Sequence, residues 1–254
     1  MLKGLSVRHF LLFPLVAFSS SAISKTTALP YLQPVFTLSA GASISQPGQS
    51  QSFAPLDLCS YHYTPNGSNT TNMLWGGFIG SNVKRSPSWE LVTGLGYYQP
   101  NSISTKGLLI QGADPMSETT YRYRYQTQSQ QLLAEGKLYW LVKERLHPFF
   151  MLGIGAAFNK TSDYQTSVPP FLEFTPAFFN HTQTSFTYAF GPGIDISVSK
   201  FFRAGVAYRF TDLGSANTGT AQIDEIPISS TLKQSHLYAN QILVQFTFIP
   251  WTKD

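Results

Sequence analysis

The stretch Pro148-Phe149-Phe150-Met151-Leu152-Gly153-Ile154-Gly155-Ala156-Ala157-Phe158 decides how this chain folds. Every second residue from Phe150 to Phe158 is apolar, and most of these side chains are large, whereas Gly153, Gly155 and Ala157 stand between them. Successive side chains of a β-strand point to opposite faces, so the stretch has one apolar face and a second face that carries the small residues Gly153, Gly155 and Ala157. The apolar face needs an apolar partner, and lipid is the partner that we expect.

The same alternation recurs along the chain and predicts eight strands. Short segments at 83–87, 142–147 and 199–200 alternate with long ones at 45–72, 99–120, 159–184 and 212–235. Short turns at one end and long loops at the other are typical of outer-membrane barrels. We therefore predict an all-β, eight-stranded antiparallel up-and-down transmembrane β-barrel with short periplasmic turns and four long extracellular loops. The predicted strands are Val35–Ile44, Met73–Asn82, Ser88–Tyr98, Tyr121–Leu141, Pro148–Phe158, Ser185–Val198, Phe201–Thr211 and His236–Ile249.

Charged residues recur on the face of these strands that lies opposite the apolar one. A barrel of eight strands has an interior just wide enough for side chains. Three acids and three bases in so narrow a space are expected to pair and to plug the lumen. The inward glycines would leave room for them. The predicted lumen charge network consists of Glu90, Glu135, Lys137, Asp195, Arg203 and Arg209. Aromatic residues near the strand ends, Trp75, Trp89, Trp140, Tyr208 and Trp251, suit the two interfaces of a membrane.

One predicted strand departs from the simple pattern. Tyr121, Tyr123 and Tyr125 fall on its inner face, which places Arg122 and Arg124 on the face that lipid should contact. Either the strand carries a bulge, or its upper half stands above the membrane. We favour the second interpretation, in which the two arginines belong to a rim.

The first residues have the form of a secretory signal. Lys3 and Arg8 precede a short apolar run that ends at Phe18, and small residues follow up to Ala22. The predicted organisation is a signal peptide at 1–22, a periplasmic segment at 23–34, the barrel at 35–249 and a short tail at 250–254. The alternative, a retained membrane anchor, is disfavoured by the length of the run.

Composition narrows the class of protein further. Charged residues make up 12% of the chain and aromatic residues 15%, yet no run beyond the signal has the roughly 18 apolar residues of a spanning helix. Without Lys3 and Arg8, 15 basic residues face 13 acidic ones and form no basic block, so we expect no nucleic-acid partner. Cys59, the only cysteine, has no partner for a disulfide.

The third long loop contains an apolar and aromatic run where water would be expected. Its predicted contact patch consists of Phe171, Phe174, Phe178 and Phe179. One interpretation packs these rings over the barrel mouth against Tyr121, Tyr123 and Tyr125. The other has them contact a host surface, lipopolysaccharide or a hydrophobic ligand.

Three segments carry a family resemblance. The segments Gln130–Leu138, His147–Gly155 and Ala207–Gly214 resemble the small Gram-negative outer-membrane β-barrel proteins of the OmpA membrane-domain and opacity-type surface antigen families. The resemblance implies residence in the outer membrane and a structural or adhesin-like surface role. It implies outer-membrane lipids, lipopolysaccharide, the insertion machinery and host or cell-surface ligands as partners, with no cofactor. The chain departs from the family where residues 249–254 follow Phe248, because such barrels usually end on an aromatic residue.

Two other functions remain as alternatives, a narrow channel for small solutes or ions and a barrel enzyme acting on lipid A. Ser235 and His236, with Asp212 or Asp224 as an orienting acid, come nearest to a nucleophile and base. Neighbouring residues of a strand point to opposite faces, however, so we expect no enzyme. The histidines show no spacing typical of metal ligands.

Overall fold

The computed structural model describes residues 33–55, 59–112, 118–142, 145–169 and 174–250. The predicted signal peptide at 1–22 and nearly all of the segment at 23–34 lie outside these residues. The description begins at Gln33 and Pro34, which lie just before the predicted start of the barrel at Val35 and already belong to its first strand. No helix in the described part of the chain is long and apolar enough to cross a membrane.

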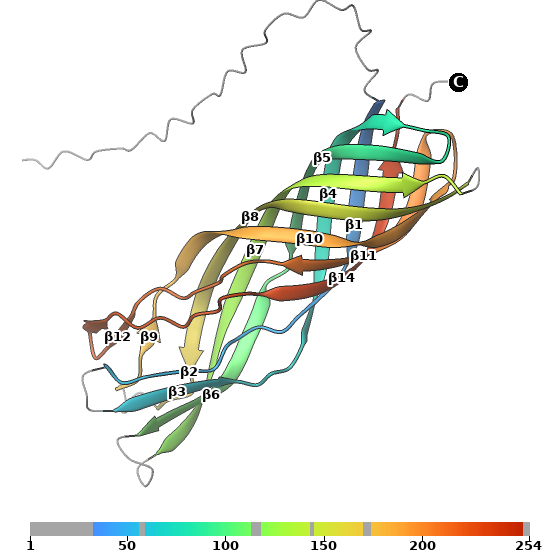
Figure 1. Cartoon of the computed structure of the whole chain (residues 1–254). Helices are drawn as coiled ribbons and strands as arrows, with labels where there is room; N and C mark the ends of the chain where they lie inside the picture. The colour runs from blue at the N-terminus through green and yellow to red at the C-terminus, as the bar shows by residue number, and fades with distance from the viewer. Residues whose placement is uncertain (1–32, 56–58, 113–117, 143–144, 170–173, 251–254) are drawn as a thin grey trace, which may run out of the picture. The chain divides into compact units, whose positions relative to one another are not determined.

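Eight strands form a closed ring in which each strand runs antiparallel to both of its neighbours (Figure 1). β14 pairs with β1, which closes the ring and gives each of the eight strands a partner on both sides. The ring confirms the predicted fold class. In ring order the strands are β1 (Gln33–Ser45), β4 (Thr70–Arg85), β5 (Trp89–Pro100), β7 (Thr119–Trp140), β8 (Leu146–Thr166), β10 (His181–Ser197), β11 (Phe202–Asp212) and β14 (Tyr238–Phe248).

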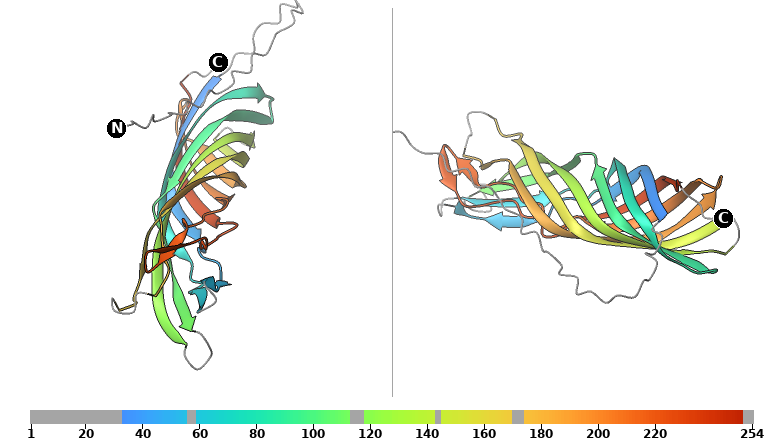
Figure 2. Two further views of the ribbon diagram at one scale, coloured as in Figure 1. Left: turned by 90° about the vertical axis from the view of Figure 1, so that its left-hand side faces the viewer. Right: turned by 90° about the horizontal axis from the view of Figure 1, so that it is seen from above.

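Inside and outside alternate along most of each strand in the ring, as the sequence predicts. Along β14, exposed residues alternate with buried ones from Tyr238 to Phe248. On β8, Phe150, Leu152 and Ile154 are exposed, whereas the residues between them face the enclosed space. Figure 2 shows the ribbon of the strands from two further directions. A Cβ atom at Gly96 would collide with the carboxylate of Glu135, so the inward glycines do leave room for long charged side chains.

The predicted long loops are largely built from strands, which the sequence analysis did not foresee. β8 runs eight residues past its predicted end at Phe158. Of six short strands, β2, β3 and β6 continue the barrel sheet beyond the ring, whereas β9, β12 and β13 form a separate three-stranded sheet. β6 takes over from β5 along the same edge of β7, because β5 ends at Pro100 while β7 is 22 residues long. The short strands are β2 (Gln51–Phe53), β3 (Ser60–Pro65), β6 (Ile103–Gly112), β9 (Ala177–Phe178), β12 (Ala221–Ile223) and β13 (Ile226–Ile228). They lie at the end of the barrel opposite the short turns (Figure 1).

The inward tyrosines of β7 have a simple explanation. Inside and outside alternate without interruption from Tyr121 to Trp140, so β7 itself carries no bulge. The register shift lies on its partner β8, where Asp163 adopts a positive φ of 56°. The tyrosines therefore point inward because β7 continues above the ring as a wall of the extension, in agreement with the interpretation that we favoured.

Candidate functional site

All six residues of the predicted charge network point into the lumen. Glu90 on β5 and Arg203 on β11 form an ion pair with 2.5 Å between Oε1 and Nη1. Their strands lie four places apart in the ring of eight, so this pair crosses the full width of the lumen. The Glu90 and Arg203 side chains are only 2% and 11% exposed, respectively. Water therefore has little access to the lumen at this level.

The second ion pair is more completely buried than the first, and an aromatic ring packs against its guanidinium. Arg209 on β11 approaches Glu135 on β7 at 3.9 Å, and both side chains are fully buried. The guanidinium Cζ of Arg209 lies 3.6 Å from the ring centroid of Tyr98, whose hydroxyl donates to Glu135. The Nε of Arg209 donates to Gln241 at 2.7 Å. The sequence analysis left Tyr98 out of the network, although its place two residues after inward Gly96 would have revealed it.

Lys137 and Asp195 complete the network without forming a direct ion pair with each other. The Nζ of Lys137 lies 4.6 Å from the centroid of the Phe78 ring, a cation–π contact. Asp195 accepts hydrogen bonds from Gln245 at 2.6 Å and from Tyr139 at 3.2 Å. The plug is thus made of two ion pairs, cation–π contacts and hydrogen bonds rather than of three ion pairs.

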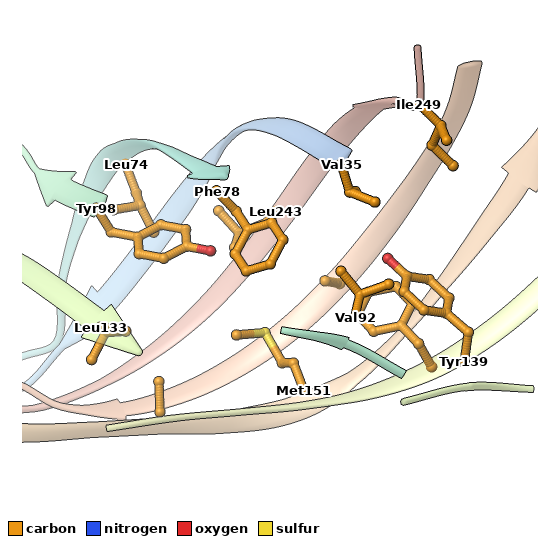
Figure 3. Close-up of a cluster of buried hydrophobic side chains, with 13 residues drawn as sticks. Val35, Leu74, Phe78, Val92, Tyr98, Leu133, Tyr139, Met151, Leu243 and Ile249 are labelled. Carbon is orange, nitrogen blue, oxygen red and sulfur yellow. The ribbon is translucent and has the colours of Figure 1, made fainter. Parts of the chain in front are cut away.

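Apolar side chains fill the lumen between these charges. Figure 3 shows Phe78, Tyr98, Tyr139 and Met151 reaching from different strands into the enclosed space. Each is at most 2% exposed. In the described residues the interior is therefore packed like a core, and the charged groups are embedded in it.

The outside of the barrel carries a belt of exposed apolar side chains. On β7 this belt spans about nine residues, from Leu132 to Trp140, which matches the 9–11 residues with which a tilted strand crosses a bilayer. Trp75, Trp140 and Tyr208 are 49%, 44% and 41% exposed, as expected of residues at a membrane interface, and Trp251 lies outside the described residues. We call this surface the apolar belt, and it marks the part of the barrel that spans the membrane.

Above the belt, the extension encloses an aromatic cluster that we call the aromatic cup. Tyr63 lies at its centre, with its ring centroid 5.0 Å from that of Tyr123 and 5.8 Å from that of Phe178. The Tyr63 hydroxyl lies 3.1 Å from that of Tyr164. Burial raises the pKa of Tyr61 to about 12 and raises the pKa of Tyr63 still further. The cup consists of Phe53, Tyr61, Tyr63, Tyr121, Tyr123, Tyr125, Tyr164 and Phe178 with the aliphatic side chains of Leu109, Ala221, Ile223, Ile228 and Leu232.

The predicted contact patch in the third loop needs correction. Phe178 is only 7% exposed and packs inside the aromatic cup, so it is not part of a contact surface. Phe174 and Phe179 are 64% and 51% exposed, and Phe171 lies outside the described residues. The backbone carbonyl of Phe174 accepts hydrogen bonds from Tyr61 and Gln111. The loop is therefore attached to the cup through Phe178, while two of its rings face outward.

The residues considered for catalysis form only part of a catalytic arrangement. The Nδ1 of His236 lies 2.7 Å from Oδ2 of Asp212, the acid proposed to orient it. Asp212 also accepts a hydrogen bond from the backbone of Gly214. No nucleophilic side chain of the described residues is hydrogen-bonded to Nε2 of His236, and Ser235 contacts Gln49 through its backbone instead. Asp212 and His236 thus fasten the fourth loop to β11.

The described residues give no support for a metal site or for a function of the Cys59 thiol. The described residues contain no group of three or more His, Cys, Asp or Glu side chains that could hold a metal ion. Cys59 is a free, partly exposed thiol at the edge of the aromatic cup.

Known proteins offer limited similarity. No family model and no curated protein match the sequence. Among solved structures, Neisserial surface protein A is 7% identical with a TM-score of 0.42, covering 85% of this chain and 96% of its own. The outer membrane protein OprG from Pseudomonas aeruginosa is 12% identical with a TM-score of 0.46, covering 86% and 97%. The outer membrane protease OmpT from Escherichia coli is 7% identical with a TM-score of 0.46, covering 89% and 99%. At these identities and TM-scores, the case for a function rests on the residues of this chain.

Proposed function

We propose that this chain is an integral outer-membrane β-barrel with a non-catalytic, structural or surface-recognition role. The observation that carries the proposal is the closed ring itself, which is apolar outside, plugged inside and extended by strands at one end only. A closed ring satisfies its backbone hydrogen bonds without water, which is the condition for strands to cross lipid. The extension would then stand outside the cell.

The plug argues against a channel. The Glu90–Arg203 pair crosses the lumen, and the rings of Phe78, Tyr98 and Tyr139 fill the space around the network. Opening a path for ions would require buried, paired charges to separate. We expect no unitary conductance from the purified protein in planar bilayers, whereas discrete single-channel steps would favour the channel.

The fourth loop argues against an enzyme that acts on lipid A. His236 has an orienting acid, but no nucleophile among the described residues is hydrogen-bonded to its other ring nitrogen, and attack on an ester or amide would need such a group. We expect the mass spectrum of lipid A to be unchanged when the protein is expressed. A new lipid A species that disappears in the His236→Ala variant would favour the enzyme.

Recognition is assigned to the extension because its backbone is held in place. Strand pairing and the aromatic cup would hold Phe174 and Phe179 in a defined arrangement before any ligand arrives. A rigid surface loses less conformational entropy on binding than a flexible loop does. The adhesin-like role is tested by cell adhesion of the Phe174→Ser/Phe179→Ser double variant, with loss of adhesion expected while the barrel still inserts.

Placement and orientation can be tested together in cells. In a Cys59→Ser background, Ser68→Cys puts a thiol at an exposed site of the extension and Ser88→Cys puts one at a short turn. A membrane-impermeant maleimide should label Ser68→Cys in intact cells and Ser88→Cys only after lysis. The unheated protein should also migrate differently from the boiled protein on a gel. Equal labelling of the two sites, or recovery outside the outer-membrane fraction, would overturn the proposal.

A further inference from the structure

A basic cleft lies on the outer wall of the extension, and the functions considered above make no use of it. The cleft has a volume of about 620 Å³ and lies where β6, β7 and β8 run side by side. Lys106, Arg122 and Arg124 line it with exposed side chains. These residues alternate with the inward side chains of the aromatic cup, so they point outward, sideways from the barrel.

The cleft offers hydrogen-bond donors and positive charge. Arg124 donates through Nε and Nη2 to Oε1 of Gln165, which orients its guanidinium and leaves Nη1 for a ligand. The Ser167 hydroxyl oxygen accepts from the backbone of Arg122 and can still donate its own proton. None of the three cations forms an ion pair within the described part of the chain. Guanidinium groups held in this way suit phosphate, which they can bind through two parallel hydrogen bonds.

No acidic residue is among the described residues that line the cleft. Asp163 at the bulge of β8 accepts a hydrogen bond from Ser162, and it does not line the cleft. Glu118 directly precedes β7 and is likewise absent from the lining. Lys160 adds a further exposed cation lower on the same face, where it pairs with Gln128.

The height of the cleft indicates which phosphate it would meet. Along the outer face of β7, the apolar belt ends at Leu132, three glutamines follow, and Arg124 comes next. Eight residues of a strand tilted by about 40° place Arg124 roughly 20 Å above the belt. In the outer leaflet of the outer membrane, the phosphorylated saccharide of lipopolysaccharide occupies this level. A sideways-facing cleft at this height would meet neighbouring lipid before any molecule from solution.

We propose that Lys106, Arg122 and Arg124 form a binding site for phosphoryl groups on the saccharide headgroup of lipopolysaccharide. The inference rests on the proposed outer-membrane location and specifies one partner of the barrel. Binding there would attach the outer wall of the extension to the surrounding leaflet and hold the extension upright.

The test compares charge removal at the two ends of the full-length barrel. The site variant is Lys106→Gln/Arg122→Gln/Arg124→Gln, and the matched control, Lys84→Gln/Arg85→Gln/Arg145→Gln, removes three exposed cations at the short-turn end. A heat-dependent gel shift first establishes that both variants fold. Binding of labelled phosphorylated lipopolysaccharide to the protein in dodecylmaltoside micelles should weaken on the order of 100-fold in the site variant only. Lipopolysaccharide dephosphorylated with hydrofluoric acid should bind the wild type as weakly as phosphorylated lipopolysaccharide binds the site variant.

Two results would overturn the site. One is equal binding of phosphorylated lipopolysaccharide by the wild type and the site variant. The other is binding of inositol hexaphosphate, but not of lipopolysaccharide, by the wild-type protein, because the ligand of the cleft would then be a soluble phosphate. The maleimide experiment separates this failure from failure of the proposed function, because it reports location without reference to the cleft.

Discussion

Replacing Arg203 with methionine tests whether the lumen is closed. Methionine keeps much of the side-chain volume but removes the only cation that pairs directly with Glu90 among the described residues. Glu90 would remain 2% exposed, with a single long hydrogen bond of 3.4 Å from Asn82. An uncompensated carboxylate would then be buried in the barrel, so we expect a large loss of stability.

The size of this loss follows from the geometry of the ion pair. For charge centres roughly 4 Å apart and an effective dielectric constant of about 20, the Coulomb attraction is about 4 kcal/mol. Breaking one side of a buried pair typically costs about 3–5 kcal/mol. We expect about 3 kcal/mol, because Arg85 lies across from Glu90 and can supply a distant, screened charge. Glu90→Gln should cost less, since Arg203 is partly exposed and lies above the Tyr139 ring.

The double variant Glu90→Gln/Arg203→Met removes both charges together. It should recover most of the loss, giving a coupling energy of about 2 kcal/mol or more in a double-mutant cycle. Urea unfolding of the barrel in lipid vesicles, followed by tryptophan fluorescence, measures all four proteins, and the exposed substitution Lys160→Met serves as the control. If each single variant costs less than about 1 kcal/mol and no coupling appears, Glu90 is solvated. The lumen would then be wet, and the argument against a channel would fail.

Three further predictions concern the extension. Phe178→Ala should destabilise the aromatic cup by about 3 kcal/mol, whereas Phe174→Ala at an exposed position should leave the same unfolding curve within about 0.5 kcal/mol. Burial raises the pKa of Tyr61 from 10.0 to about 12, so the folded chain keeps a proton that the unfolded chain loses. The stability that the buried, protonated Tyr61 contributes is complete below pH 10 and is lost as pH rises through 12. A phenolate absorbance titration should show a tyrosine ionising near pH 12. If this ionisation step is unchanged in the Tyr61→Phe variant, the assignment to Tyr61 is contradicted. Asp212→Ala removes the hydrogen bonds to His236 and Gly214, and it should cost about 2 kcal/mol and speed hydrogen exchange at the Gly214 amide.

The eight long strands were predictable because their pattern is local. Every second residue from Phe150 to Phe158 is apolar, and lipid accepts any large apolar side chain on the outer face, so the pattern does not depend on a particular neighbour. The short strands gave no comparable signal. β2 and β12 are three residues each, too short to show a period. The pairing of β12 also depends on β9, which lies far earlier in the sequence.

The candidate sites divide in the same way. Strand periodicity placed all six charged residues of the plug in the lumen, but it did not pair Glu90 with Arg203, which lie 113 residues apart. Phe178 and Phe174 looked equivalent in the sequence, yet one is buried and the other exposed, because only Phe178 meets the rings of Tyr63 and Tyr164. The contribution of Lys106 to a cleft with Arg122 and Arg124 also required the register of β6 against β7.

By itself, therefore, the sequence determined that this chain forms a barrel with an apolar exterior, a charged interior and its longer segments at one end. Alternation with a period of two is a property of each strand separately, and each strand carries that property in its own residues. Only the tertiary structure decided which charges meet, that short strands form within the long segments, and that three cations share a cleft on the outer wall of the extension. Those outcomes depend on the register and closure of the ring, which bring together side chains that are far apart along the chain.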